Sequence, residues 1–388
     1  MVHNYYQQAG GEDRVFLEET DLLEANGHEV VRYCLHNEQV ATVSPATLAK
    51  GTLWSAPAYR DLEDLLRRER PHLAHFHNTF PLISPAGYYA ARAAGVPVVQ
   101  TLHNYRLLCP NALFYRDGGP CEDCLGRAVT WPGMVHGCYR GSRAASAVVT
   151  AMLTAHRAAR TWAKAVDLYV ALTEFARRKF VEGGLPAEKI EVKPNFVRPD
   201  PGVGTGKGGF ALFVGRLSPE KGVGTLLEAW DRFGEGVPLK VVGDGPLTGR
   251  VLSVADRRPD VEYLGRKPAE EVRALMKEAG VLVFPSEWYE TFGRVAAEAF
   301  AAGTPVVASD IGAVAEMVDD GRTGLLFRPG DAGHLASQVK RVLNRPEEYA
   351  RMRREARTEF EAKYTAERNY GMLMKLYESA SMRAEVPA

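Results

Sequence analysis

Short apolar runs alternate with amphipathic segments along almost the whole chain, and this alternation limits the fold more than any other feature. Such an alternation is typical of parallel sheets whose strands are joined by helices. In the first half it predicts strands at His28–Leu35, His72–His77, Val96–Leu102 and Leu168–Ala171. In the second half it predicts strands at Phe210–Val214, Leu239–Val242, Val261–Tyr263, Val281–Phe284, Pro305–Ala308 and Gly324–Phe327. The predicted fold class is therefore α/β, with doubly wound parallel sheets.

The 388 residues exceed one ordinary domain, so two or three domains are expected. A run rich in proline and glycine, Pro199–Gly209, separates the two α/β halves and is interpreted as a linker. We therefore predict a first domain over residues 1–198 and a second over 199–365, facing each other across a cleft. Only Met1–His3 are available for a strand before the first glycine-containing loop, Gln7–Gly11, so either the first strand is short or the true start lies upstream.

The overall composition excludes several classes of protein. Lys+Arg and Asp+Glu are both 48, which argues against a strongly basic nucleic-acid-binding protein. The longest uncharged, apolar-leaning stretches, Thr79–Ala91 and Ala144–Ala155, are shorter than the roughly 18 residues of a spanning helix. The polar start indicates no signal peptide, and five cysteines argue against a secreted disulfide scaffold. A cytoplasmic protein is expected.

A glycine-containing loop, Gly215–Gly222, follows one predicted strand and precedes the helix predicted at Val223–Phe233. Arg216 and Lys221 flank the start of that helix, and a helix N-terminus with two cations can hold a diphosphate. A plain loop carrying two solvated cations explains the pattern equally well at this point.

Two glutamates follow the predicted strand Val281–Phe284. Glu290 precedes a predicted helix and Glu298 comes eight residues later, about 80° round the same helix at 3.6 residues per turn. Both carboxylates can therefore face one cleft, and the N–H groups of Phe292 and Gly293 can face an anion. An acid favoured by the helix dipole, followed by a surface glutamate, explains the same residues.

Three histidines in the first half lie on or directly after predicted strands. His103 follows Val96–Leu102, where a side chain of a doubly wound domain can point toward a ligand. A histidine that only satisfies hydrogen bonds in its loop is the alternative. His75 and His77, on the strand His72–His77, are interpreted as packing or polar-tip residues.

Several segments in a fixed order resemble one family. In the second half they are Gly215–Gly222, Val242-Gly-Asp-Gly-Pro246, Tyr263-Leu-Gly265, the pair Glu290 and Glu298, Thr304-Pro-Val-Val-Ala308 and Gly321-x-x-Gly-Leu-Leu326. In the first half they are Gly10-Gly11, Thr101-Leu-His103 and Lys193-Pro-Asn195. Together they make the chain resemble the retaining nucleotide-sugar glycosyltransferases of family 4, which have the GT-B fold.

The resemblance implies a hexosyl-type transferase that needs no divalent metal, and it implies a role for each matching residue. Arg216 and Lys221 would hold the donor diphosphate, and Glu290 and His103 would contact the transferred sugar. Donor-binding roles would fall to Gly10, Gly11, Gly243, Leu264, Phe292, Gly293 and Glu298. The acceptor would be a glycan, a lipid-linked molecule or a small molecule. The final helix, within residues 366–388, would cross back to the first domain.

Four cysteines depart from the general family pattern. They lie within an insertion at residues 109–138 that is rich in proline and glycine, at Cys109, Cys121, Cys124 and Cys138. Four thiolates that include one Cys-x-x-Cys pair can hold a structural zinc ion. Two disulfides or free thiols are the alternatives. Cys34 lies on a predicted strand and is interpreted as an ordinary core cysteine.

The segment from Leu125 to Phe180 carries nine cations and two acids. Its polar residues recur every three or four positions, at Arg143, Ser146, Thr150, Thr154, Arg157, Arg160 and Lys164. This pattern predicts one polar, basic helix face, which can rest on an anionic membrane or remain solvated. Peripheral attachment to the inner face of a membrane is thus one expectation.

Two other classes of function would place different requirements on the sequence. A nicotinamide oxidoreductase would need Gly-x-Gly-x-x-Gly between a strand and a helix, and this arrangement is missing from the sequence. A non-catalytic nucleotide-sugar-binding component of a polysaccharide assembly system is the alternative. The joint presence of Arg216, Lys221, Glu290 and Glu298 argues for catalysis.

Overall fold

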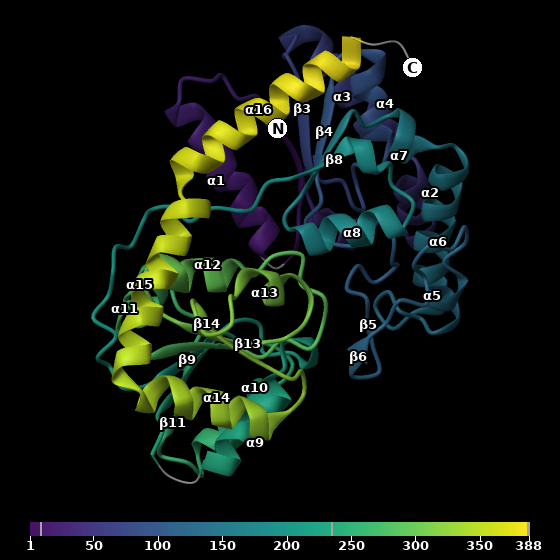
Figure 1. Ribbon diagram of the computed structural model, residues 1–388. Coiled ribbons are helices and arrows are strands. Elements are labelled where there is room, and N and C mark those ends of the chain that lie inside the picture. The colour runs from purple at the N-terminus through teal and green to yellow at the C-terminus, as the bar shows by residue number, and fades with distance from the viewer. Residues whose placement is uncertain (8–9, 234–235, 386–388) are drawn as a thin grey trace. The chain divides into compact units, whose positions relative to one another are not determined.

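The computed structural model describes residues 1–7, 10–233 and 236–385, which form two compact units (Figure 1). The first unit contains residues 1–114, 121–194 and the chain from Asn369 onward. The second contains residues 115–120 and 195–368. The first unit is thus assembled from both ends of the chain.

The first unit is built on a six-stranded parallel sheet in the order β2-β1-β3-β4-β7-β8. Its strands are β1 (Val2–Tyr5), β2 (Tyr33–His36), β3 (Ala74–Asn78), β4 (Val98–Thr101), β7 (Leu168–Ala171) and β8 (Ile190–Val192). Its helices are α1 (Gly11–Ala25), α2 (Pro45–Leu53), α3 (Ala56–Glu69), α4 (Ala86–Ala93), α5 (Trp131–Val135), α6 (Arg143–Ala158), α7 (Thr161–Lys164), α8 (Glu174–Glu182) and α16 (Ala366–Glu385). Because β3, β4 and β7 are buried along their whole length, both faces of the sheet are covered.

The second unit has a six-stranded parallel sheet in the order β11-β10-β9-β12-β13-β14. Its strands are β9 (Ala211–Val214), β10 (Leu239–Val242), β11 (Val261–Gly265), β12 (Val281–Phe284), β13 (Val306–Ser309) and β14 (Gly324–Phe327). Its helices are α9 (Val223–Phe233), α10 (Thr248–Ala255), α11 (Ala269–Glu278), α12 (Arg294–Ala301), α13 (Gly312–Met317), α14 (Ala332–Asn344) and α15 (Pro346–Lys363). The order reverses between β9 and β12, where a doubly wound sheet opens a crevice for ligands.

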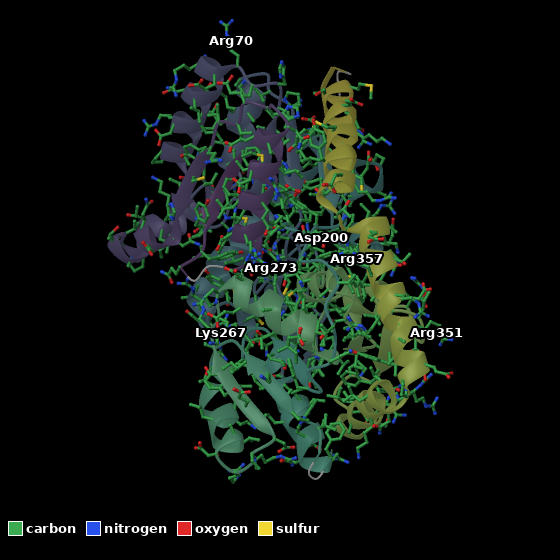
Figure 2. The ribbon with its side chains drawn as sticks, turned by 90° about the vertical axis from the view of Figure 1, so that its left-hand side faces the viewer. Arg70, Asp200, Lys267, Arg273, Arg351 and Arg357 are labelled. Atoms are coloured by element: carbon green, nitrogen blue, oxygen red, sulfur yellow. The ribbon has the colours of Figure 1, made fainter. Side chains whose placement is uncertain are left out.

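The segment expected to be a linker is fixed to the second unit. Asp200 receives two hydrogen bonds from Arg357 of α15, both of 2.7 Å, and Figure 2 shows the two residues side by side. Gly204 and Gly206 donate backbone hydrogen bonds to Ala302 and Lys277. The glycines allow this close approach, because a Cβ on Gly204 would lie 2.0 Å from the Lys277 carbonyl oxygen. The high glycine content of this segment therefore reflects close backbone packing as well as a domain boundary.

A short β-hairpin within the four-cysteine insertion belongs to the second unit. Its strands, β5 (Tyr115–Arg116) and β6 (Gly119–Pro120), pair antiparallel. The rest of the insertion belongs to the first unit. Among the described helices, none is both long and apolar enough to cross a membrane.

Candidate functional site at the topological switch point

The loops after β9 and β12 bring two predicted site residues together in the second unit. Lys221 ends a 3-10 turn, Pro219–Lys221, that links β9 to α9. Glu290 lies in the loop between β12 and α12. The Lys221 Nζ and Glu290 Oε1 atoms are 2.5 Å apart, and the carboxylate is buried whereas the lysine side chain stays partly open to solvent. An ion pair therefore stands where the strand order reverses.

Glu290 is held by further donors from its own loop. Ser286 Oγ donates to Glu290 Oε1 over 2.8 Å, and Trp288 Nε1 donates to the same oxygen over 2.9 Å. Sequence reasoning missed Ser286 and Trp288, although their closeness to Glu290 along the chain was a usable signal. With Lys221, three donors converge on one carboxylate oxygen, which orients the carboxylate and lowers its nucleophilicity.

Glycines allow the surrounding loops to pack backbone against backbone. Gly222 has φ +67°, and a Cβ there would lie 1.7 Å from the Pro285 carbonyl oxygen. Gly243, directly after β10, has φ +135°, and its Cβ would lie 1.9 Å from the Gly215 oxygen. Both positions thus exclude every other residue type. Together they draw the ends of β9, β10 and β12 close enough to form one site.

Arg216 and Leu264, two further predicted donor-binding residues of the second unit, lie at the same edge of the sheet. Arg216 follows β9 after Gly215 and is exposed. Leu264 is next to the last residue of β11, half-buried, and Gly243 donates a backbone hydrogen bond of 2.9 Å to Gly265. The ends of three adjacent strands therefore carry Arg216, Gly243 and Leu264.

The structure corrects the predicted geometry of the second glutamate. Glu290 is not on the helix, because α12 begins at Arg294 with Gly293 as its N-cap, so the angle of 80° does not apply. Glu298, on α12, pairs instead with Arg294, whose Nε is 3.1 Å from Glu298 Oε1. The Gly293 N–H is not free either, since it contacts Met317 Sδ at 3.2 Å. Phe292 is buried beside it.

The first unit holds the other predicted residues at the start of α1 and the end of β4. Gly10 is the N-cap of α1, and Gly11 is its first residue. A Cβ on either glycine would meet nothing within 4 Å, so close packing does not require glycine there. His103 follows β4 by two residues, is buried, and has Nε2 2.9 Å from His77 Nδ1.

Glu12 is a residue of this unit that sequence reasoning did not single out. Asn104 Nδ2 donates to Glu12 Oε1 over 2.6 Å and contacts the Tyr6 hydroxyl at 3.2 Å. Burial raises the pKa of Glu12 to about 7, against the opposing effect of these hydrogen bonds. A carboxyl group that titrates near neutrality thus lies beside the His103–Asn104 turn.

The four cysteines of the insertion are not joined by disulfides, and the other three lie close enough to Cys124 to act on it electrostatically. Burial and the other three thiols raise the pKa of Cys124 to about 12. Burial also raises the pKa of Cys109, whose Sγ contacts Asn111 Oδ1 at 3.1 Å. Over the described residues, no three cysteine sulfurs lie within 4.8 Å of one another.

The predicted polar face is wrong at two central positions of α6, whereas Arg143, Arg160 and Lys164 are exposed as predicted. Ser146 and Thr150 are buried, where they hydrogen-bond Tyr139 N and Thr130. Arg157 donates to backbone carbonyl oxygens of neighbouring loops. The exposed positions of α6 are Arg143 and the alanines Ala144, Ala151, Ala155 and Ala158. Polar periodicity identified the helix but placed Ser146 and Thr150 on the wrong face, because short polar side chains bond to neighbouring backbone.

Family models match both units of the chain. Residues 9–201 match Glycosyltransferase Family 4, and residues 203–359 match Glycosyl transferases group 1. The 2-deoxystreptamine glucosyltransferase of Streptomyces kanamyceticus is 31% identical over 76% of this chain and 73% of its own length. The chain therefore belongs to this family of glycosyltransferases.

Other relatives match over a smaller part or by fold alone. An uncharacterized glycosyltransferase of Methanocaldococcus jannaschii is 34% identical over 44% of this chain, and the match spans about half, 48%, of that relative. The crystal structure of HepE from Anabaena in complex with UDP superposes with a TM-score of 0.68 at 19% identity. It covers 97% of this chain and 99% of HepE. The predicted fold class, GT-B with two Rossmann-like sheets, is thereby confirmed.

Proposed function

We propose that the protein is a glycosyltransferase that moves a sugar, with retention of configuration, from a nucleoside-diphosphate sugar to a glycan, lipid-linked or small-molecule acceptor. The Lys221–Glu290 pair at the switch point of a sheet carries this proposal. HepE was crystallised with UDP, which makes UDP-sugars the first donors to test.

The catalytic roles follow from charge. When the bond between the sugar C1 and the phosphate oxygen breaks, negative charge grows on the departing diphosphate. Arg216 and Lys221 would stabilise that charge, so no metal ion would be required. Glu290 and His103 would hold the sugar hydroxyl groups.

The rest of the donor would be held mainly by backbone and by one further carboxylate. The residues proposed for this role are Gly10, Gly11, Gly243, Leu264, Phe292, Gly293 and Glu298. Glu298 would accept hydrogen bonds from the ribose hydroxyls if its carboxylate released Arg294. The N-terminus of α12 would need the Gly293 N–H to leave Met317 before it could bind an anion.

Retention fits attack of the acceptor from the face that the diphosphate leaves. The acceptor oxygen would bond to C1 as the C1–O bond breaks, and its proton would pass to the leaving phosphate oxygen. A covalent intermediate through Glu290 is disfavoured because Lys221, Ser286 and Trp288 already bind its Oε1. Glu290 is therefore proposed as a hydroxyl-binding residue.

Donor hydrolysis and ligand-induced stabilisation test this function. We expect one of UDP, GDP, ADP and dTDP, but not NAD, to raise the melting temperature equally with and without chelator. A diphosphate at 100 times its Kd stabilises by about 2.7 kcal/mol. Lys221→Met should weaken diphosphate binding, and Glu290→Gln should abolish hydrolysis and transfer.

A surface pair supplies the control. Lys267 and Glu271 form an ion pair of 2.9 Å in the same unit, so Lys267→Met removes a lysine–glutamate pair away from the switch point. Full activity in both Lys221→Met and Glu290→Gln would refute the roles proposed for this ion pair. Diphosphate binding without hydrolysis or transfer by the unaltered protein would favour the non-catalytic alternative.

We also propose a structural zinc ion bound by Cys109, Cys121, Cys124 and Cys138. Support comes from the four thiols around Cys124, although Zn–S bonds would require the sulfurs to approach to about 3.8 Å. We expect about one zinc per chain by elemental analysis. Cys124→Ser should lose the metal, whereas Cys34→Ser should keep it. Full zinc content in Cys124→Ser, or none in the unaltered protein, would refute the site.

We further propose that the protein is cytoplasmic and that its first unit rests on an anionic membrane. Support comes from a surface we call the α5 patch, made of exposed Val129, Trp131, Met134 and Val135. The exposed cations Arg127, Arg140 and Arg143 lie close to it in sequence, and no acid occurs between Asp123 and Asp167. Tryptophan with apolar and cationic neighbours suits a bilayer interface.

A further inference from the structure

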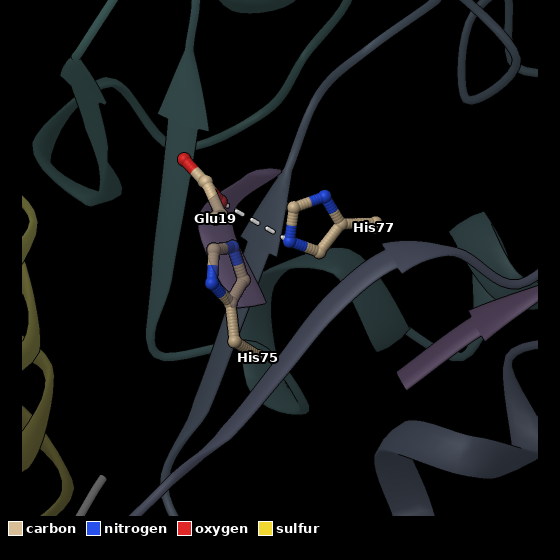
Figure 3. Close-up of side chains that lie close together, drawn as sticks. All are labelled: Glu19, His75 and His77. Carbon is tan, nitrogen blue, oxygen red and sulfur yellow. Dashed lines mark ion pairs between the residues drawn. The ribbon is translucent and has the colours of Figure 1, made fainter. Parts of the chain in front are cut away.

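A buried chain of polar side chains connects the centre of the first unit to His103. Lys193 Nζ contacts Glu19 Oε1, and both side chains are fully buried. Glu19 Oε2 lies 3.2 Å from His77 Nε2, and Figure 3 shows this pair with His75 beside it. His77 Nδ1 in turn lies 2.9 Å from His103 Nε2. The chain thus runs from Lys193 through Glu19 and His77 to His103.

The same side chains resemble a metal site, since donor atoms of Glu19, His75 and His77 lie within 4.8 Å of one another. Their other contacts argue against one. His75 already contacts the Tyr377 hydroxyl at 2.8 Å and Thr101 Oγ1 at 2.7 Å. The Lys193 ammonium lies against Glu19, where it would repel a second cation. The cluster is better explained as a hydrogen-bonded chain than as a metal site.

This chain of hydrogen bonds determines which nitrogen of each histidine ring carries the proton. Beside buried Lys193, the Glu19 carboxylate is ionised and can only accept. Among the described residues, Glu19 Oε2 and His77 Nε2 have no hydrogen-bond partner of good geometry, so each is best satisfied by the other. His77 must therefore protonate Nε2, and its Nδ1 accepts from the Nε2–H of His103.

We propose that Glu19, held by Lys193, is a positioning residue that fixes His103 as its Nε2–H tautomer through His77. The proposal rests on the proposed sugar contact of His103, because the tautomer decides which ring nitrogen can donate a hydrogen bond and which can accept one. Desolvation by burial lowers the pKa of both His77 and His103, which keeps the two rings neutral. The chain of hydrogen bonds thereby keeps His103 as a neutral ring in one tautomer.

The first test needs no substrate. Nitrogen NMR of ¹⁵N-histidine-labelled full-length protein distinguishes the two tautomers of a neutral imidazole. His77→Gln and His103→Gln serve only to assign the signals. We expect Nε2–H tautomers at both His77 and His103 at pH 7. A Nδ1–H tautomer at His103 would overturn the proposal.

The second test removes the Glu19–Lys193 ion pair, which is proposed to fix the tautomer of His103. Glu19→Gln alone would leave Lys193 buried without a counter-charge, so Glu19→Gln/Lys193→Met removes both charges together. We expect a mixture of His103 tautomers and a fall in kcat of about tenfold or more, with diphosphate affinity unchanged. If the His103 tautomer is unchanged in a folded double variant, the positioning role of Glu19 is refuted.

His156 supplies the matched control. It is another buried histidine of this unit, and its nitrogens lie 2.9 Å from Thr161 Oγ1 and from the Leu53 carbonyl oxygen. His156→Gln should lower the melting temperature but leave kcat and the His103 tautomer unchanged. The two proposals can be refuted independently. Absence of transfer activity in the unaltered protein would refute the proposed transferase function. The tautomer measurement on the same protein would still decide whether Glu19 fixes the tautomer of His103.

Discussion

Single residues show how far the sequence alone could define the site. Lys221 and Glu290 were both found from their loops, but their direct pairing joins positions 69 residues apart and no local pattern encodes it. His77 was predicted to be a packing or polar-tip residue, and the sequence did not indicate that it contacts both Glu19 and His103. Its role depends on Lys193, which is 174 residues from Glu19 in the chain. Contacts between charged residues so far apart in the sequence become visible only in the folded structure.

Glu12 makes the stability of the first unit depend on pH. Its pKa is raised to about 7, so between about pH 4.5 and 7 the folded chain keeps a proton that the unfolded chain releases. Stability from this group is therefore present at low pH and lost as pH rises through that window.

Glu12→Gln, which keeps the acceptor for Asn104, should therefore be more stable than the unaltered protein at pH 8, by at most about 3 kcal/mol. At pH 4.5 the difference should vanish. Thermal unfolding across this range checks the prediction, with Glu24→Gln on α1 as a control for removing a carboxylate. A constant difference at every pH would contradict it.

Whole elements were predicted better than their orientation. Leu168–Ala171, Leu239–Val242, Val281–Phe284 and Gly324–Phe327 are strands with the predicted bounds. Such buried parallel strands are continuous apolar runs, so the sequence marks them directly. β8, with three residues, was missed because so short a run carries little pattern. On α6 the pattern indicated a helix but misplaced two central residues, because the fold buries Ser146 and Thr150.

The α5 patch gives a prediction at the scale of one element. Vesicles containing phosphatidylglycerol should co-sediment the protein, and vesicles of phosphatidylcholine alone should do so less, because the neighbouring arginines need anionic lipid. Trp131→Ala should weaken binding about tenfold, equivalent to about 1.4 kcal/mol of lost burial.

Trp54, in the same unit, is a matched control because it is 42% exposed and Trp131 is 48% exposed. Trp54→Ala should leave vesicle binding unchanged. Equal losses in the two variants, or a dimer that Trp131→Ala abolishes, would assign the α5 patch to another role.

At the scale of the whole molecule, the chain returns to its first unit through α16. Leu373, Leu376 and Ala380 of this helix are buried, and Leu376 packs against Val99 and Leu168 of the sheet. The Tyr377 hydroxyl lies 2.8 Å from His75 Nδ1, and Asn369 contacts Lys193. The first unit therefore needs residues that follow the second in sequence.

Removing the chain after Arg368 should accordingly destabilise the first unit selectively. The two buried leucines alone account for about 3–6 kcal/mol of lost burial. Calorimetry of the full chain should resolve two transitions, and truncation should lower the temperature of one of them and leave the other unchanged. Leu376→Ala should act in the same direction, whereas Met382→Ala should not, because Met382 is 64% exposed. Loss of both transitions together would mean that the two units unfold as one cooperative body.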